Sequence, residues 1–272
     1  MSKFKMMAAI ASLALSSFYA CANGFSSAGN LTIGSDMTYY PYEYVKNDQP
    51  QGFDIEFMTQ VAKLMNRKPV FMDTRFANLV VGLMSGKYDI MSSSLYITPQ
   101  RLQAMDMIPY LKGGQAIVML ASAPKNLTNM TMLCGKKVAT MQGSFAAKQM
   151  RVANDSLCAD SATHQKIIIE EYPSNPEATR ALFSHAADAQ LTDAALSKGL
   201  TDRFKNRLKV TSDELLTPVL IGIGVRKGDT EVKEALTRAI TEYQQTPGYQ
   251  QLLQRYGFTR LTPQDIATLM PK

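Results

Sequence analysis

Residues 92–101 read Ser-Ser-Ser-Leu-Tyr-Ile-Thr-Pro-Gln-Arg, and they indicate the architecture of the chain more directly than any other segment. Three hydroxyl residues end an apolar run at residues 88–91, which we interpret as a buried strand. Thr98 then suits a helix N-cap and Pro99 the first helical position. Unpaired backbone N–H groups at this helix start, with Arg101 one turn in, would receive a planar anion such as a carboxylate. An ordinary strand–turn–helix with a surface arginine is the alternative that this segment alone leaves open.

Strands and helices alternate along the rest of the chain, which predicts α/β lobes with mostly parallel sheets flanked by helices. The chain crosses near residues 113–116 and returns near 217–222, so we expect two lobes joined by two hinge strands, with a ligand cleft between them. Lobe one would comprise residues 29–113 and 219–272, and lobe two residues 114–218. The expected strands are 31–35, 70–72, 88–92, 115–121, 137–140, 166–170, 188–192 and 219–225, and the expected helices include 54–65, 76–84, 99–105, 176–184, 193–197, 231–245 and 249–256.

The N-terminus is typical of an export signal. Lys3 and Lys5 precede an apolar stretch at residues 6–18, and small residues flank Cys21. That stretch is too short to span a bilayer comfortably. We therefore predict that residues 1–22 are a cleaved signal peptide and that the mature protein resides in the periplasm. A membrane-tethered N-terminus and lipidation at Cys21 are the alternatives.

Composition excludes several classes of protein. Hydrophobic residues make up 46% of the 272 residues and charged residues 19%, which is a globular balance rather than a disordered or coiled-coil one. Removing residues 1–22 removes two lysines and no acids, so the formal net charge falls from +6 to +4. The remaining positive charge is spread along the chain without a basic run. We therefore expect no nucleic-acid partner.

Two cysteines, Cys134 and Cys158, remain after signal removal. An oxidising compartment favours a disulfide between them, worth about 3 kcal/mol for a loop of this length. Two separate reduced thiols are the alternative. His164 and His185 are far apart in sequence and lack nearby partners. They predict neither a metal site nor a catalytic dyad, and we expect no cofactor.

The chain resembles the periplasmic solute-binding proteins of amino-acid ABC importers, a type II class also known as bacterial family 3. The likeness extends over about residues 29–260. Each of its short motifs is weak alone, but their joint order and spacing are specific. The motifs lie at residues 33–36, 39–43, 51–56, 85–89, 97–101, 108–110, 135–139, 141–144 and 222–229.

The resemblance implies a role for each site residue. Arg101 would hold the ligand α-carboxylate in a bidentate pair, assisted by Ser94 and Tyr96, while Asp193 would receive the α-ammonium. Tyr39 and Phe53 would sandwich the side chain, and the loop at residues 142–145 would complete the pocket. Asp36 matches a position that can meet a cationic side chain in binders of basic amino acids. No catalytic residue is expected. The full expected ligand-binding set is Asp36, Tyr39, Phe53, Ser93, Ser94, Tyr96, Arg101, Gln142, Ser144, Phe145 and Asp193.

Some residues depart from the family pattern. Tyr96 stands where a small hydroxyl residue is common, Phe76 where tryptophan is frequent, and Phe145 where a small polar residue is usual. These changes leave the grip on the α-carboxylate and α-ammonium intact and leave the ligand side chain open. Asp36 as the cap of a turn, and Asp193 as a mere helix N-cap, are the structural alternatives for the two acids.

The leading functional hypothesis is a monomeric, non-enzymatic receptor that delivers a polar amino acid or amino-acid derivative to an inner-membrane ABC permease. The runner-up is an enzyme on the same scaffold, similar to cyclohexadienyl dehydratases that act on prephenate or arogenate. That chemistry needs a general acid in the cleft, and Asp36 and Asp193 are the candidates. A third hypothesis is a sensory module that presents its ligand to a receptor kinase.

Overall fold

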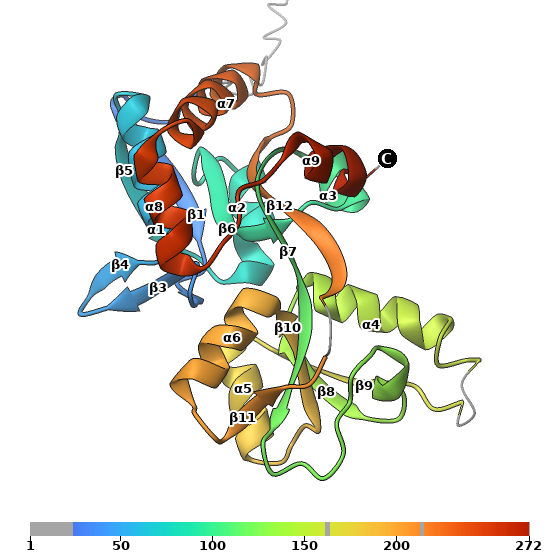
Figure 1. The fold of residues 1–272 in the computed structure, drawn as a ribbon. Helices are drawn as coiled ribbons and strands as arrows, with labels where there is room; N and C mark the ends of the chain where they lie inside the picture. Colours follow the sequence, from blue (N-terminus) through green and yellow to red (C-terminus); the bar gives the residue numbers. More distant parts are fainter. Residues whose placement is uncertain (1–23, 161–163, 213–214, 272) are drawn as a thin grey trace, which may run out of the picture.

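The computed structural model describes residues 24–160, 164–212 and 215–271, which form two lobes (Figure 1). The predicted signal peptide, Cys21 included, lies outside these residues. Two long strands, β7 (Met105–Leu120) and β12 (Leu216–Arg226), pair antiparallel and connect the lobes. The lobe boundaries predicted after residues 113 and 218 fall inside these two strands and remain a prediction.

One sheet continues through both lobes. Within the described residues it contains nine strands, eight of them in the order β5-β1-β6-β12-β7-β10-β8-β9, and β11 pairs with β7. Strands within a lobe pair in parallel, whereas those that meet β7 or β12 pair antiparallel. The parallel arrangement inside each lobe confirms the predicted fold class. The bounds are β1 (Asn30–Ser35), β5 (Lys68–Asp73), β6 (Ile90–Tyr96), β8 (Lys137–Met141), β9 (Ile168–Tyr172), β10 (Ala189–Asp193) and β11 (Leu208–Val210).

Lobe one is covered by helices from both ends of the sequence. Helix α1 (Phe53–Leu64) buries Phe57, Met58 and Val61 and packs against the closing helices α7 and α8. None of the helices in the described ranges is long and apolar enough to cross a bilayer. The other helices here are α2 (Leu79–Met84), which follows a short 3-10 turn at Phe76–Asn78, α3 (Pro99–Ala104), α7 (Thr230–Gln244), α8 (Pro247–Tyr256) and α9 (Pro263–Leu269).

Lobe two contains α4 (Phe145–Asp155), α5 (Asn175–Phe183) and α6 (Ala194–Arg203). Ser144 caps α4 by accepting the Ala147 N–H at 3.2 Å, and Asp193 caps α6. These caps follow the carboxyl ends of β8 and β10, so the starts of the helices gather at one edge of the sheet. Ligands of open α/β sheets bind at that edge.

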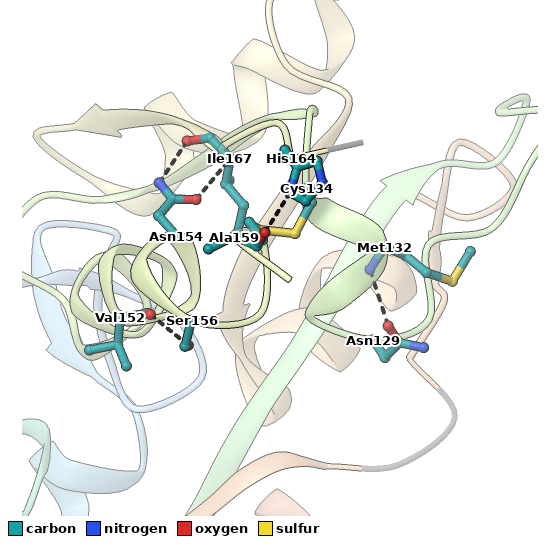
Figure 2. Close-up of a disulfide and its surroundings, with 10 residues drawn as sticks. Asn129, Met132, Cys134, Val152, Asn154, Ser156, Ala159, His164 and Ile167 are labelled. Atoms are coloured by element: carbon teal, nitrogen blue, oxygen red, sulfur yellow. Dashed lines mark hydrogen bonds between the residues drawn. A yellow bond between two sulfur atoms is a disulfide. The ribbon is translucent and has the colours of Figure 1, made fainter. Parts of the chain in front are cut away.

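The predicted disulfide is confirmed. Cys134 and Cys158 are bonded, with their Cα atoms 5.5 Å apart (Figure 2). Their separation of 24 residues encloses α4 and so ties the end of that helix to the loop before β8.

Several predicted boundaries were wrong; the strand predicted at residues 115–121, for example, begins at residue 105. Helix α6 does not end at Gly199 but continues to Arg203. The glycine does not mark a helix end; it leaves room for the ring of Tyr40. A Cβ there would lie 2.6 Å from Tyr40 Cε1. Likewise, the hydroxyl residues 92–94 do not end their strand but lie inside β6, fully buried or nearly so. The small sheet of β2 (Thr38–Tyr39), β3 (Glu43–Lys46) and β4 (Gln49–Gln51), together with β11 and α9, was not predicted.

Candidate ligand-binding site

A small cavity of about 20 Å³ lies between the lobes, which leaves room for roughly one water molecule in this closed arrangement. A larger ligand fits only if the lobes move apart. Gln115 of β7 contributes to the wall of the cavity beside residues of both lobes. Its lining from lobe one is Tyr39, Phe76, Ser94, Tyr96 and Arg101, and from lobe two Thr140, Met141, Ser144, Phe145, Ala146, Asn175, Thr192 and Asp193.

Arg101 brings the positive charge to this cavity. Thr98 caps α3 by accepting the Arg101 backbone N–H at 3.2 Å, and the guanidinium Nη1 donates to the Tyr96 carbonyl at 2.8 Å. The guanidinium also lies 5.5 Å from the centre of the Phe76 ring. Burial lowers the pKa of Arg101 to about 10, so the side chain stays charged at neutral pH. No carboxylate among the described residues pairs with it, which leaves donors of the guanidinium fork for a planar anion.

Asp193 brings the negative charge from the opposite lobe. Its Oδ1 accepts the N–H groups of Ala195 at 2.8 Å and Leu196 at 3.3 Å, and the Tyr42 hydroxyl at 3.0 Å. Its Oδ2 accepts the Tyr96 hydroxyl at 2.5 Å. Burial raises the pKa of Asp193, while these hydrogen bonds oppose the rise. Asp193 is therefore both the cap of α6 and part of the cavity wall, and its role as the acceptor of an α-ammonium stays a prediction.

Two buried polar atoms of the cavity wall have no hydrogen-bond partner among the described residues. They are the Ser94 hydroxyl oxygen and Gln115 Oε1. Gln115 lies directly opposite Asp193 in the β7–β10 ladder. An unsatisfied buried polar group costs about 1–3 kcal/mol, so both atoms are suited to hydrogen bonds with a bound molecule.

Several residues of the expected set do not line the cavity. Phe53 packs in the aromatic core with Phe57 and Phe258, and the Ser93 hydroxyl donates to Glu43 at 2.6 Å. Gln142 borders an outer groove at the rim instead. The expected residues that do line the cavity are Tyr39, Ser94, Tyr96, Arg101, Ser144, Phe145 and Asp193.

Asp36 also lies outside the cavity lining, and it is fully buried. Its Oδ1 accepts the Thr38 hydroxyl at 2.7 Å and pairs with Arg75 at 3.0 Å, and its Oδ2 accepts the Phe76 N–H at 2.8 Å. The carboxylate therefore fixes the turns after β1 and β5, which is the structural alternative raised for it from the sequence.

The predicted site set did not include Phe76, Gln115, Thr140, Met141, Ala146, Asn175 and Thr192. For most of these residues the sequence did contain a signal of their position. They lie at the carboxyl ends of predicted strands or at the start of the next predicted helix, where an open α/β sheet places its ligand. Gln115 had no comparable signal, because it lies within β7 and reaches the cavity only through the crossover between the lobes.

A pair of buried carboxyl groups lies beneath the hydroxyl residues of β6. Asp54 accepts the Tyr110 hydroxyl at 2.7 Å and the Ser94 N–H at 3.0 Å. Glu43 and Asp54 are hydrogen bonded to each other, so one of them must carry a proton. Burial raises the pKa of Glu43 well above its usual range and that of Asp54 to about 6.

Comparison with known proteins agrees with this architecture, which is that of a two-lobed type II binding protein. Residues 31–259 match the family model of bacterial extracellular solute-binding proteins, family 3. The chain belongs to this family, as its sequence motifs indicated.

The histidine-binding periplasmic protein of Escherichia coli K12 is 28% identical over 235 residues, which cover 84% of this chain and 87% of that protein. A solved ancestral arginine-binding protein bound to glutamine has a TM-score of 0.77 at 25% identity, covering 85% of this chain and 98% of its own. An ancestral amino acid-binding protein described as a precursor of cyclohexadienyl dehydratase has a TM-score of 0.73 at 26% identity, covering 85% and 96%.

Proposed function

We propose that this protein is the substrate-binding component of an ABC importer, which captures a polar amino acid or amino-acid derivative in the periplasm and delivers it to an inner-membrane permease. The observation that carries the proposal is the pair of opposite charges, Arg101 and Asp193, that reach one cavity from different lobes. The amino-acid-binding relatives of the same family support it.

The charges match the two ends of an α-amino acid. The guanidinium of Arg101 and the Ser94 hydroxyl would donate to the α-carboxylate, and Asp193 with Gln115 Oε1 would accept from the α-ammonium. A desolvated, charge-assisted hydrogen bond contributes roughly 1.5–3 kcal/mol. Because the two ends are held by different lobes, the ligand stabilises the closed arrangement over an open one, as a binding-driven closure requires.

We infer that the protein binds its ligand without transforming it. Asp193 is the only carboxyl group among the described lining residues, and both of its oxygens already accept hydrogen bonds that favour the ionised form. A dehydratase would need a protonated acid here. Incubation with prephenate, followed by chromatography, tests the point: unchanged prephenate fits a binding protein, and its conversion to an aromatic product would establish the enzyme.

A thermal-shift screen of the mature chain against amino acids tests the proposal directly. A ligand at 100 times its Kd should stabilise the folded state by about 2.7 kcal/mol. Arg101→Ala should abolish every such shift, and Arg101→Lys should weaken it because a lysine cannot form the bidentate pair. Arg238→Ala is the matched control, since Arg238 is exposed on α7 and pairs only with Glu234 among the described residues. Shifts that survive in Arg101→Ala would refute the carboxylate assignment.

A further inference from the structure

We infer that the amino acid taken by this site has an uncharged side chain that carries a hydrogen-bond acceptor. The inference rests on the proposed function and narrows its substrate class. Arg101 and Asp193 are the only charged residues in the described lining of the cavity. The α-carboxylate and α-ammonium of the ligand neutralise both of them. No lining charge of either sign is then left for the side chain of the ligand.

The acid that could have met a cationic side chain is already engaged. Asp36 is fully buried, and its two oxygens bind Thr38, Arg75 and the Phe76 N–H. Turning this carboxylate toward the cavity would break the ion pair with Arg75 at 3.0 Å and leave a buried N–H unpaired. Lysine and arginine side chains would therefore enter the site without a counter-ion, which strongly disfavours a desolvated charge.

The helices of lobe two also oppose a positive side chain. Ser144 caps α4, Asn175 is the first residue of α5, and Asp193 caps α6, and all three residues line the cavity. Helix N-termini carry partial positive charge. Asp193 offsets this charge at α6 and Glu177 offsets it in the first turn of α5, whereas the first turn of α4 carries no acid. These partial charges are much weaker than the full charge of a side-chain cation. They would therefore not offset the cost of desolvating a carboxylate on the ligand side chain, so an acidic side chain is disfavoured as well.

The acceptor is inferred from Asn175, a residue that is only 3% exposed. Its Oδ1 accepts the Thr192 hydroxyl at 3.3 Å, whereas its Nδ2 has only the Met141 sulfur at 3.5 Å among the described residues. A thioether is a weak acceptor. A carboxamide or hydroxyl oxygen on the ligand would satisfy this buried donor, and the aromatic rings of Phe76 and Phe145 would cover the methylene groups that precede it.

Titration calorimetry with individual amino acids tests the inference. Glutamine, asparagine, serine and threonine should include the tightest ligand, and lysine, arginine and glutamate should bind about 100-fold more weakly than that ligand. The apolar isostere of the best ligand should lose about tenfold, because it leaves Asn175 Nδ2 unsatisfied. Binding of lysine, arginine or glutamate within tenfold of the best neutral ligand would overturn the inference, and so would an apolar isostere that binds equally well.

A single substitution in the cavity wall supplies the complementary test. Asn175→Asp places a carboxylate in the wall without changing side-chain shape, and an acid suits the first turn of α5. The variant should lose affinity for the neutral ligand by about tenfold and gain a measurable affinity for lysine or arginine. A variant that folds, as judged by circular dichroism, and still rejects both basic amino acids would count against the inference.

The two proposals fail in different ways. If neither an amino acid nor an amino-acid derivative binds the wild-type protein, the proposed function is wrong. If amino acids bind in an Arg101-dependent manner but basic ones bind as well as neutral ones, only the inference about the side chain is wrong.

Discussion

The carboxyl groups of Glu43 and Asp54 are both fully buried, and they lie behind the cavity rather than in it. Glu43 Oε2 has no partner among the described residues as long as both groups are ionised. A proton on Oε2, donated to Asp54, satisfies that atom. The raised pKa of Glu43 agrees with this arrangement, because burial and the neighbouring Asp54 both favour its neutral form.

This pair makes stability fall as pH rises. A carboxyl group whose pKa is raised by folding binds its proton more tightly in the folded state, so its contribution is complete below the unfolded pKa and is lost as pH rises through the folded pKa. For Asp54 the pKa rises from 3.8 to about 6. Urea denaturation should therefore show a free energy of unfolding on the order of 3 kcal/mol lower at about pH 8 than at about pH 4 from this group alone.

The Glu43→Gln variant separates the pH dependence of stability that this pair causes from that of the other titrating groups. The glutamine amide can donate to Asp54 permanently, as the protonated Glu43 does, so it favours ionised Asp54 at all pH values. We expect the variant to be at least as stable as wild type near pH 8 and to show a flatter dependence on pH between about 5 and 8. Parallel curves for the two proteins would show that the pair does not share a proton.

Among the elements, the contact of α2 with β1 depends on two glycines. The buried ring of Tyr88 lies between them, since a Cβ on Gly34 would lie 2.4 Å from its Cζ and a Cβ on Gly82 2.4 Å from its hydroxyl oxygen. The Tyr88 hydroxyl also donates to the Leu79 carbonyl of α2. No side chain larger than hydrogen fits at either position without moving the ring.

Gly82→Ala should therefore destabilise the protein although alanine favours helices. The gain in helix propensity is about 1 kcal/mol, while overpacking against Tyr88 costs about 1–3 kcal/mol, so we expect a net loss of up to about 2 kcal/mol in urea denaturation. Val81→Ala is the control on the same helix, because Val81 is 69% exposed and its truncation should change stability by less than about 0.5 kcal/mol. A more stable Gly82→Ala variant would contradict this packing argument.

The elements that the sequence predicted well are those with a strong local pattern. Residues Thr98, Pro99 and Arg101 fix the start of α3 by local hydrogen bonding, so the sequence alone placed Arg101 correctly at the carboxyl end of β6. Gly199 misled the prediction because its role is tertiary: it makes room for Tyr40 of the other lobe. Asp36 was ambiguous for the same reason, since only the folded chain brings Arg75 beside it.

At the level of the whole molecule, two tyrosines of lobe one meet one acid of lobe two. The hydroxyls of Tyr42 and Tyr96 donate to the two oxygens of Asp193, and Lys148 of α4 donates to Gln100 of α3 at 2.9 Å. The rings of Tyr96 and Phe145 also lie 5.5 Å apart across the cavity. These contacts join the lobes directly, while β7 and β12 are the connections about which they would move.

Tyr96→Phe should shift the protein without added ligand toward an open arrangement. The substitution removes one hydrogen bond to a charged group, worth roughly 1.5–3 kcal/mol, which changes the ratio of closed to open molecules by about 10- to 100-fold. Small-angle X-ray scattering should record a larger radius of gyration for this variant than for wild type when no ligand is added, and equal radii at saturating ligand, because Arg101 and Asp193 still hold the two ends of the zwitterion. Tyr249→Phe is the matched control, since its buried hydroxyl has no partner among the described residues and lies in the core of lobe one. Equal radii for all three proteins without ligand would show that the tyrosine contacts do not govern closure.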